Sequence, residues 1–132
     1  MKFPSFLLWA NGLLFALFGA GFLILPAQMA MLVTESAPAS PGGLTDMRAT
    51  YGGLSLGIGL FLGHCARTGA FRSGLLASLL MLSSAALGRL LGIYLDGKPT
   101  WMIVLLLTAE IIFSVLSVTA LIVSDDENAC GA

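Results

Sequence analysis

Charged residues are scarce in this chain, and their scarcity excludes most soluble proteins. Asp, Glu, Lys and Arg together make up 10% of the 132 residues, and apolar residues make up 58%. A typical soluble domain has about 25% charged and roughly 45–50% apolar residues. The net charge of −1 provides no basic surface for a phosphate backbone, so we expect no nucleic-acid partner. The composition indicates an integral membrane protein whose surroundings are a lipid bilayer.

Cysteine and histidine are also rare, which excludes a disulfide framework and the common metal sites. The chain has two cysteines, Cys65 and Cys130, and one histidine, His64. A structural zinc site needs four such ligands, and a small disulfide-rich domain needs several cysteine pairs. We therefore expect unpaired thiols, no metal and no cofactor.

Long apolar segments, in contrast, are abundant. No charge occurs between Phe3 and Thr34 or between Ala49 and Ala66, and two later segments carry one charge each. About 20 apolar residues cross a bilayer as a helix, because backbone groups in lipid must bond within their own segment. We predict an all-α integral membrane four-helix bundle with short connections, one longer first loop, and helices at about residues 6–25, 45–63, 73–95 and 100–123.

These segments predict one domain over residues 1–124, followed by a polar C-terminal tail at 125–132. The bias of Lys and Arg favours a cytoplasmic N-terminus, since that orientation places Lys2, Arg67 and Arg72 inside and leaves two cations outside. The expected location is the cell membrane, as a multi-pass protein of the bacterial inner membrane.

Two charges of opposite sign fall inside the predicted spans. Arg89 lies six residues before the end of the third helix, and Glu110 lies nine residues after Trp101 in the fourth. At about 1.5 Å per residue, they sit roughly 9 and 14 Å below the connection that joins these helices. Because an unpaired charge at this depth costs several kcal/mol, we predict that Arg89 and Glu110 pair across the two helices.

Helical spacing brings further polar side chains toward the same mouth of the bundle. Polar groups at this depth mark either a functional site or a structural contact between helices, and both readings stay open. Asn11, in the first helix, is expected to donate a hydrogen bond between helices. The candidate ligand-binding residues are Asp46, Arg48, Tyr51, Arg89, Tyr94, Asp96 and Glu110.

The segments around these residues resemble a known family. Residues 46–53 read D-M-R-A-T-Y-G-G, residues 89–99 read R-L-L-G-I-Y-L-D-G-K-P, and Glu110 follows. Together they are similar to the small bacterial membrane proteins grouped as domain of unknown function 4345, over about residues 5–122. The resemblance implies four transmembrane helices, no established activity, and one shared arrangement of Arg48, Arg89, Asp96 and Glu110.

Three functions are compatible with these features. The first is binding of a lipid or small amphiphile at the polar site, by the chain alone, as a homo-oligomer or as an accessory subunit. Arginines would hold an anionic group there by bidentate hydrogen bonds. The second is a small proton-coupled transporter that uses Glu110. The third is a membrane enzyme of the isomerase or cyclase type, in which a desolvated carboxylic acid donates a proton to a lipophilic substrate.

Overall fold

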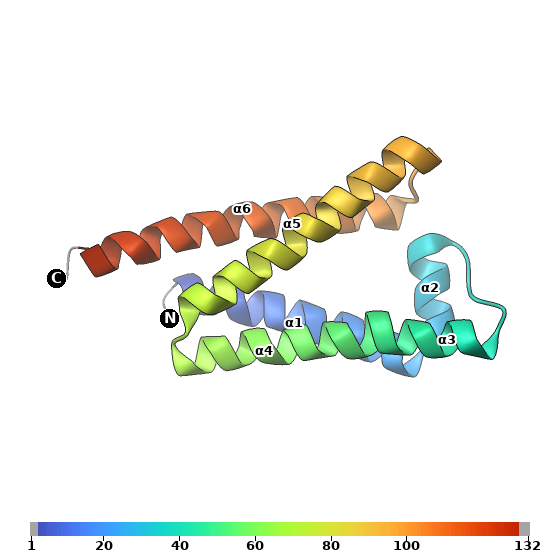
Figure 1. Cartoon of the computed structure of the whole chain (residues 1–132), viewed down its shortest axis with the longest axis horizontal. Coiled ribbons are helices and arrows are strands. Elements are labelled where there is room, and N and C mark those ends of the chain that lie inside the picture. Colours follow the sequence, from blue (N-terminus) through green and yellow to red (C-terminus); the bar gives the residue numbers. More distant parts are fainter. Residues whose placement is uncertain (1–2, 130–132) are drawn as a thin grey trace.

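The computed structural model describes residues 3–129, and Lys2 and Cys130 lie outside the described residues. The described part is all-α, with no strand in it. Its elements are α1 (Phe3–Ile24), α2 (Pro26–Thr34), α3 (Pro41–Met47), the π-helical η1 (Arg48–Gly53), α4 (Leu54–Thr68), α5 (Phe71–Asp96) and α6 (Trp101–Ala129). Figure 1 shows that α3, η1 and α4 continue one another as a single rod.

The described chain therefore has five separate helices, and the predicted count of four is wrong. The additional helix is α2, which occupies the segment expected to be a loop. Leu25 leaves the helical conformation because it precedes Pro26, and Pro26 then starts α2 at a position where its missing N–H is not needed. The helix ends at Thr34, whose hydroxyl donates to Ala30 O, and Glu35 takes a left-handed conformation after it.

The rod of α3, η1 and α4 begins at Pro41, four residues before the predicted start at residue 45. Ser40 caps it, because the Ser40 hydroxyl accepts a hydrogen bond of 3.1 Å from the Gly43 amide. Pro41 follows at the first helical position, where proline is favoured. A segment rich in proline and glycine is thus the start of a helix.

Three helices are long and apolar enough to cross a membrane by length and composition: Phe3–Ile24, Phe71–Asp96 and Trp101–Val123. Large apolar side chains on them point outward, and Leu17, Leu87 and Val115 are each about 60% exposed or more. Exposing so large an apolar surface to water is unfavourable, whereas the hydrocarbon chains of a bilayer solvate it. These features indicate a membrane protein.

The closest packing joins α1 to the rod of α3, η1 and α4. A Cβ atom added at Gly19 would lie 2.5 Å from the backbone nitrogen of Leu56 and 2.7 Å from the Gly52 oxygen. A Cβ atom added at Gly59 would lie 2.6 Å from the Gly12 oxygen. Lipid gives no hydrophobic driving force between helices, so such backbone contact supplies much of the attraction.

The α5–α6 hairpin joins the α1–α4 pair mainly at one end, near the connection between α4 and α5. A buried apolar cluster lies there and draws on all four long helices: Leu7, Leu8, Leu62, Cys65, Ala66, Leu75 and Ala120. Figure 1 shows the C-terminal half of α5 leaving the rod toward the opposite end. There α2 crosses between α1 and the start of α6, where a second cluster contains Phe22, Ala30 and Val33.

We expect Gly19→Ala to lower the free energy of unfolding by about 1–3 kcal/mol, because the new methyl group meets backbone atoms that cannot yield without separating the helices. The measurement is reversible unfolding in mixed micelles. The matched control is Gly57→Ala in α4, where a Cβ atom meets nothing within 4 Å. That control should be neutral or slightly stabilising. Equal effects of the two changes would contradict the close approach.

Candidate functional site

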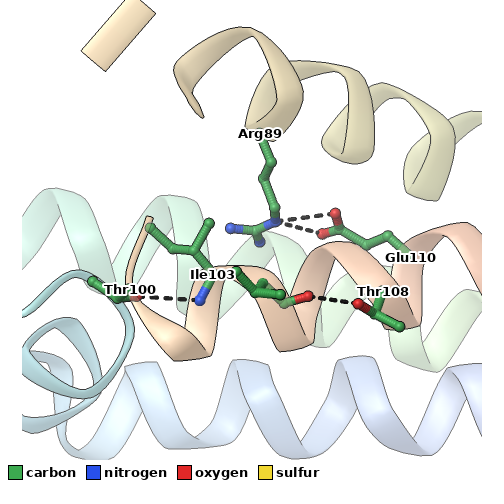
Figure 2. Close-up of polar contacts among 6 residues, drawn as sticks. Arg89, Thr100, Ile103, Thr108 and Glu110 are labelled. Carbon is green, nitrogen blue, oxygen red and sulfur yellow. Dashed lines mark hydrogen bonds and ion pairs between the residues drawn. The ribbon is translucent and has the colours of Figure 1, made fainter. Parts of the chain in front are cut away.

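Arg89 and Glu110, which the sequence analysis paired, are in contact in the structure. Arg89 extends from α5 toward α6, and its Nε donates hydrogen bonds of 2.9 Å to Glu110 Oε1 and 3.0 Å to Oε2 (Figure 2). Both carboxylate oxygens thus share one N–H group. The contact joins the two helices of the second hairpin well away from the connection between them.

The guanidinium group of Arg89 has donors to spare. It carries five N–H groups, and the contact with Glu110 uses only the one on Nε. Figure 2 shows the two terminal nitrogens directed away from the carboxylate. Neither of them bonds to another residue in the part of the chain that the structure describes. The group therefore can hold an anion while it stays paired with Glu110.

The two charges differ in burial. The Glu110 side chain is 10% exposed, whereas the Arg89 side chain is 26% exposed. A ligand thus reaches Arg89 more readily than it reaches Glu110. The arginine is the group that can contact a ligand, and the carboxylate holds the arginine in place.

Polar side chains continue along the interior from this pair. On α6, Ser114 and Ser117 follow Glu110 at helical spacing; the Ser117 hydroxyl donates to Phe113 O, and the Ser114 hydroxyl is buried without a partner among the described residues. Asn11 Nδ2 donates a hydrogen bond of 2.8 Å to Ser78 Oγ, which is the bond between helices expected of Asn11. The Asn11 bond therefore joins α1 to α5 by a polar contact, in addition to their apolar packing.

Arg48 and Tyr51 contact the end of α1 through the π-helical turn η1. Arg48 Nε donates a hydrogen bond of 3.1 Å to the carbonyl oxygen of Leu23. The Tyr51 ring stacks on the Phe22 ring, and the two ring centroids are 5.2 Å apart. A π-helical turn holds one more residue than an α-turn and occurs frequently at functional sites. Sequence reasoning missed this turn, and the Gly52-Gly53 pair within it is the only local signal.

The remaining three candidates lie on the surface, as Arg48 and Tyr51 also do. Asp46 is exposed near the end of α3, Tyr94 is 84% exposed, and Asp96 is exposed at the end of α5, with its carboxylate turned back toward Gly92. None of the three forms a hydrogen bond or ion pair within the described residues. Of the seven candidates, Arg89 and Glu110 are the two that a hydrogen bond joins directly.

The start of α6 lies near this site and is fixed by Thr100. Its hydroxyl accepts a hydrogen bond of 3.2 Å from the Ile103 amide (Figure 2). It also donates a hydrogen bond of 3.1 Å to Val33 O at the end of α2. The first contact caps α6, and the second ties α2 to α6. Sequence reasoning assigned no role to Thr100. The bond to Val33 depends on α2, which was not expected.

The described residues contain no group of three or more His, Cys, Asp or Glu side chains that could hold a metal ion. Cys65 is buried and forms no disulfide within the described residues, and it belongs to the apolar cluster of the four long helices. The chemical groups that the site offers a ligand are the N–H donors and the positive charge of the Arg89 guanidinium group.

The model of a family described as Domain of unknown function (DUF4345) matches residues 4–121. No curated protein and no solved structure matches this chain.

We expect Arg89→Met to destabilise the protein by about 3–5 kcal/mol, because it leaves the buried Glu110 carboxylate without its donor. Glu110→Leu should cost less, because Arg89 is partly exposed and its long side chain can reach a polar group outside the bundle. Thermal unfolding in detergent of both variants and of the double variant measures the coupling. Strictly additive effects would show that the contact does not stabilise the fold.

Proposed function

Because the chain belongs to the family of domain of unknown function 4345, whose description names no activity, we propose a function from the geometry alone. The protein binds the anionic head group of a lipid or other small amphiphile at Arg89, within the membrane. The observation that carries this proposal is the set of unused N–H donors on an arginine that Glu110 already holds in position.

Electrostatics support an anionic ligand. Glu110 offsets the charge of Arg89, which makes the arginine tolerable inside a bilayer. A phosphate or carboxylate group that accepts from the two terminal nitrogens would satisfy the remaining donors by bidentate hydrogen bonds. A cationic ligand would face the guanidinium group and be repelled.

The shape of the chain supports access from the bilayer. The C-terminal half of α5 stands apart from the rod of α3, η1 and α4 (Figure 1). Apolar side chains near Arg89 on this half of α5 are also accessible, since Leu90 is 47% exposed and Ile93 is partly exposed. The hydrocarbon tail of an amphiphile would lie against them while its head group reaches Arg89. An accessory subunit that presents such a lipid to a partner would use the same site.

The topology that we propose has four crossings. The rod from Pro41 to Thr68 is the fourth, and its 28 residues extend about 42 Å, enough for a bilayer. An N-terminus in the cytoplasm then places the Arg89 site near the outer face. The proposed location is a bacterial inner membrane, with residues 1–124 as a single domain.

Isothermal titration in a neutral detergent tests the ligand. Two probes share one tail and differ in head group: dodecyl phosphate, which is anionic, and dodecylphosphocholine, which is zwitterionic. We expect the wild-type protein to prefer dodecyl phosphate by about tenfold, since a hydrogen bond to a charged group contributes about 1.5–3 kcal/mol. Arg89→Met should abolish the preference, and Arg89→Lys should retain part of it.

The control for the titration is Arg72→Met, which removes a cation at the opposite end of the same helix and should keep the preference. Unchanged binding by a folded Arg89→Met variant would refute the proposal. Folding is checked by far-UV circular dichroism for every variant.

Cysteine labelling tests the topology. In a background with Cys65→Ala and Cys130→Ala, we expect Ser40→Cys to react with an impermeant maleimide outside the cell, and Thr68→Cys to react only after lysis. The reverse labelling pattern would show that the N-terminus lies on the outer side of the membrane. Labelling of both positions from one side would show that the rod does not cross.

A further inference from the structure

A second feature of the structure lies on the opposite pair of helices and shares no residue with the Arg89 site. A groove of about 630 Å³ runs along the outer face between α1 and α4. Glycines form its floor where the two backbones approach, at Gly12, Gly59 and Gly63. Its walls are apolar side chains that are more than half exposed, Phe6, Leu13 and Leu60.

The groove has the length of one leaflet. Its lining on α1 extends from Phe6 to Ala16, which is about 15 Å at 1.5 Å per residue. The hydrocarbon core of a bilayer is about 30 Å thick, so this length corresponds to half of it. The volume also lies within the range of roughly 300–1,000 Å³ that is usual for small-ligand sites.

Polar and amphipathic groups gather at one end of the groove. Arg67, in the last turn of α4, lines this end together with His64, and Trp9 lies beside them. Arg67 is exposed, and it forms no hydrogen bond or ion pair with any residue that the structure describes. Tryptophan prefers the head-group level of a bilayer, so this end belongs near a membrane surface. Among the described residues, none that lines the groove is acidic.

We propose that this groove binds one anionic phospholipid of the surrounding bilayer. The phosphate group lies at Arg67, and one acyl chain extends along the glycine floor between the walls. The positive charge of Arg67 at the mouth and the apolar length of the groove favour this ligand over a zwitterionic lipid. The site is independent of the function proposed at Arg89.

A second copy of the chain fits this groove less well. A two-fold dimer would bring the same surface of both copies together, so that two hollow faces would meet. If the two-fold axis is parallel to the membrane normal, the two Arg67 side chains also lie at the same depth, where their like charges repel. A phospholipid fills the hollow and neutralises the charge.

Fluorescence of Trp9 tests the proposal. The full chain with Trp101→Phe retains Trp9 as its single tryptophan, and it is reconstituted in vesicles of phosphatidylcholine that contain brominated phosphatidylglycerol or brominated phosphatidylcholine. Bromine quenches tryptophan at contact. We expect brominated phosphatidylglycerol to compete for the groove about fivefold better than brominated phosphatidylcholine, since one cation near the surface contributes about that factor.

Four further variants decide the result. Arg67→Gln should remove the preference for phosphatidylglycerol, whereas Arg72→Gln, a nearby change of equal charge, should retain it. Gly63→Leu adds a side chain to the floor, where a Cβ atom has only ordinary contact with Trp9, and should reduce quenching by both lipids. Arg89→Met should leave the preference unchanged, which separates this site from the other one.

Three results would overturn the proposal. Equal quenching by the two lipids in the unmodified groove would show that Arg67 selects no head group. A preference that survives Arg67→Gln would place the anionic lipid elsewhere. Protection of Trp9 from both lipids would show that a second copy of the chain covers the groove.

Discussion

Contact between two backbones, α1 and the rod of α3, η1 and α4, is the constraint on which the rest of the structure depends. In lipid, apolar side chains gain little by meeting one another, so helices must attract through close atomic contact and hydrogen bonds. Gly19, Gly52 and Gly59 remove the side chains that would hold these two helices apart. The α5–α6 hairpin then packs on one end of a fixed pair, through Leu8, Leu75 and the Asn11–Ser78 bond.

The polar site lies at the other end of the molecule, where α5 is not packed on this pair of helices. Where α5 departs from the rod, few apolar contacts join it to α1 or α4, and the pair of Arg89 and Glu110 links it to α6. A buried ion pair is a weak source of net stability, because desolvation offsets much of the attraction. Two apolar side chains would hold the hairpin equally well. The retention of charges here, with donors left unused, is what makes this region the candidate for function.

The sequence predicts the features that depend on composition and on distance along one helix. Arg89 and Glu110 could be paired because their depths follow from residue counts below a short connection. The helix α2 was missed because residues 27–44 contain two prolines and two glycines and were read as a loop, although Pro26 and Pro41 each start a helix. The Gly52-Gly53 pair alone does not predict the turn η1, and the groove on α1 and α4 depends on how separate helices meet, which no local pattern encodes. For the same reason, the exposure of Tyr94 and Asp96 could not be predicted.

The π-helical turn gives the two ends of the rod a fixed rotational offset. One residue corresponds to about 100° of rotation around a helix axis, so an extra residue in η1 turns α3 by about that angle relative to α4. The face of α4 that carries Gly59 can therefore stay against α1 while Asp46 in α3 points outward. Substitutions that adapt α3 to its surroundings need not disturb the packing of α4. A single rod thereby presents two faces of different direction, one toward α1 and one toward the surroundings.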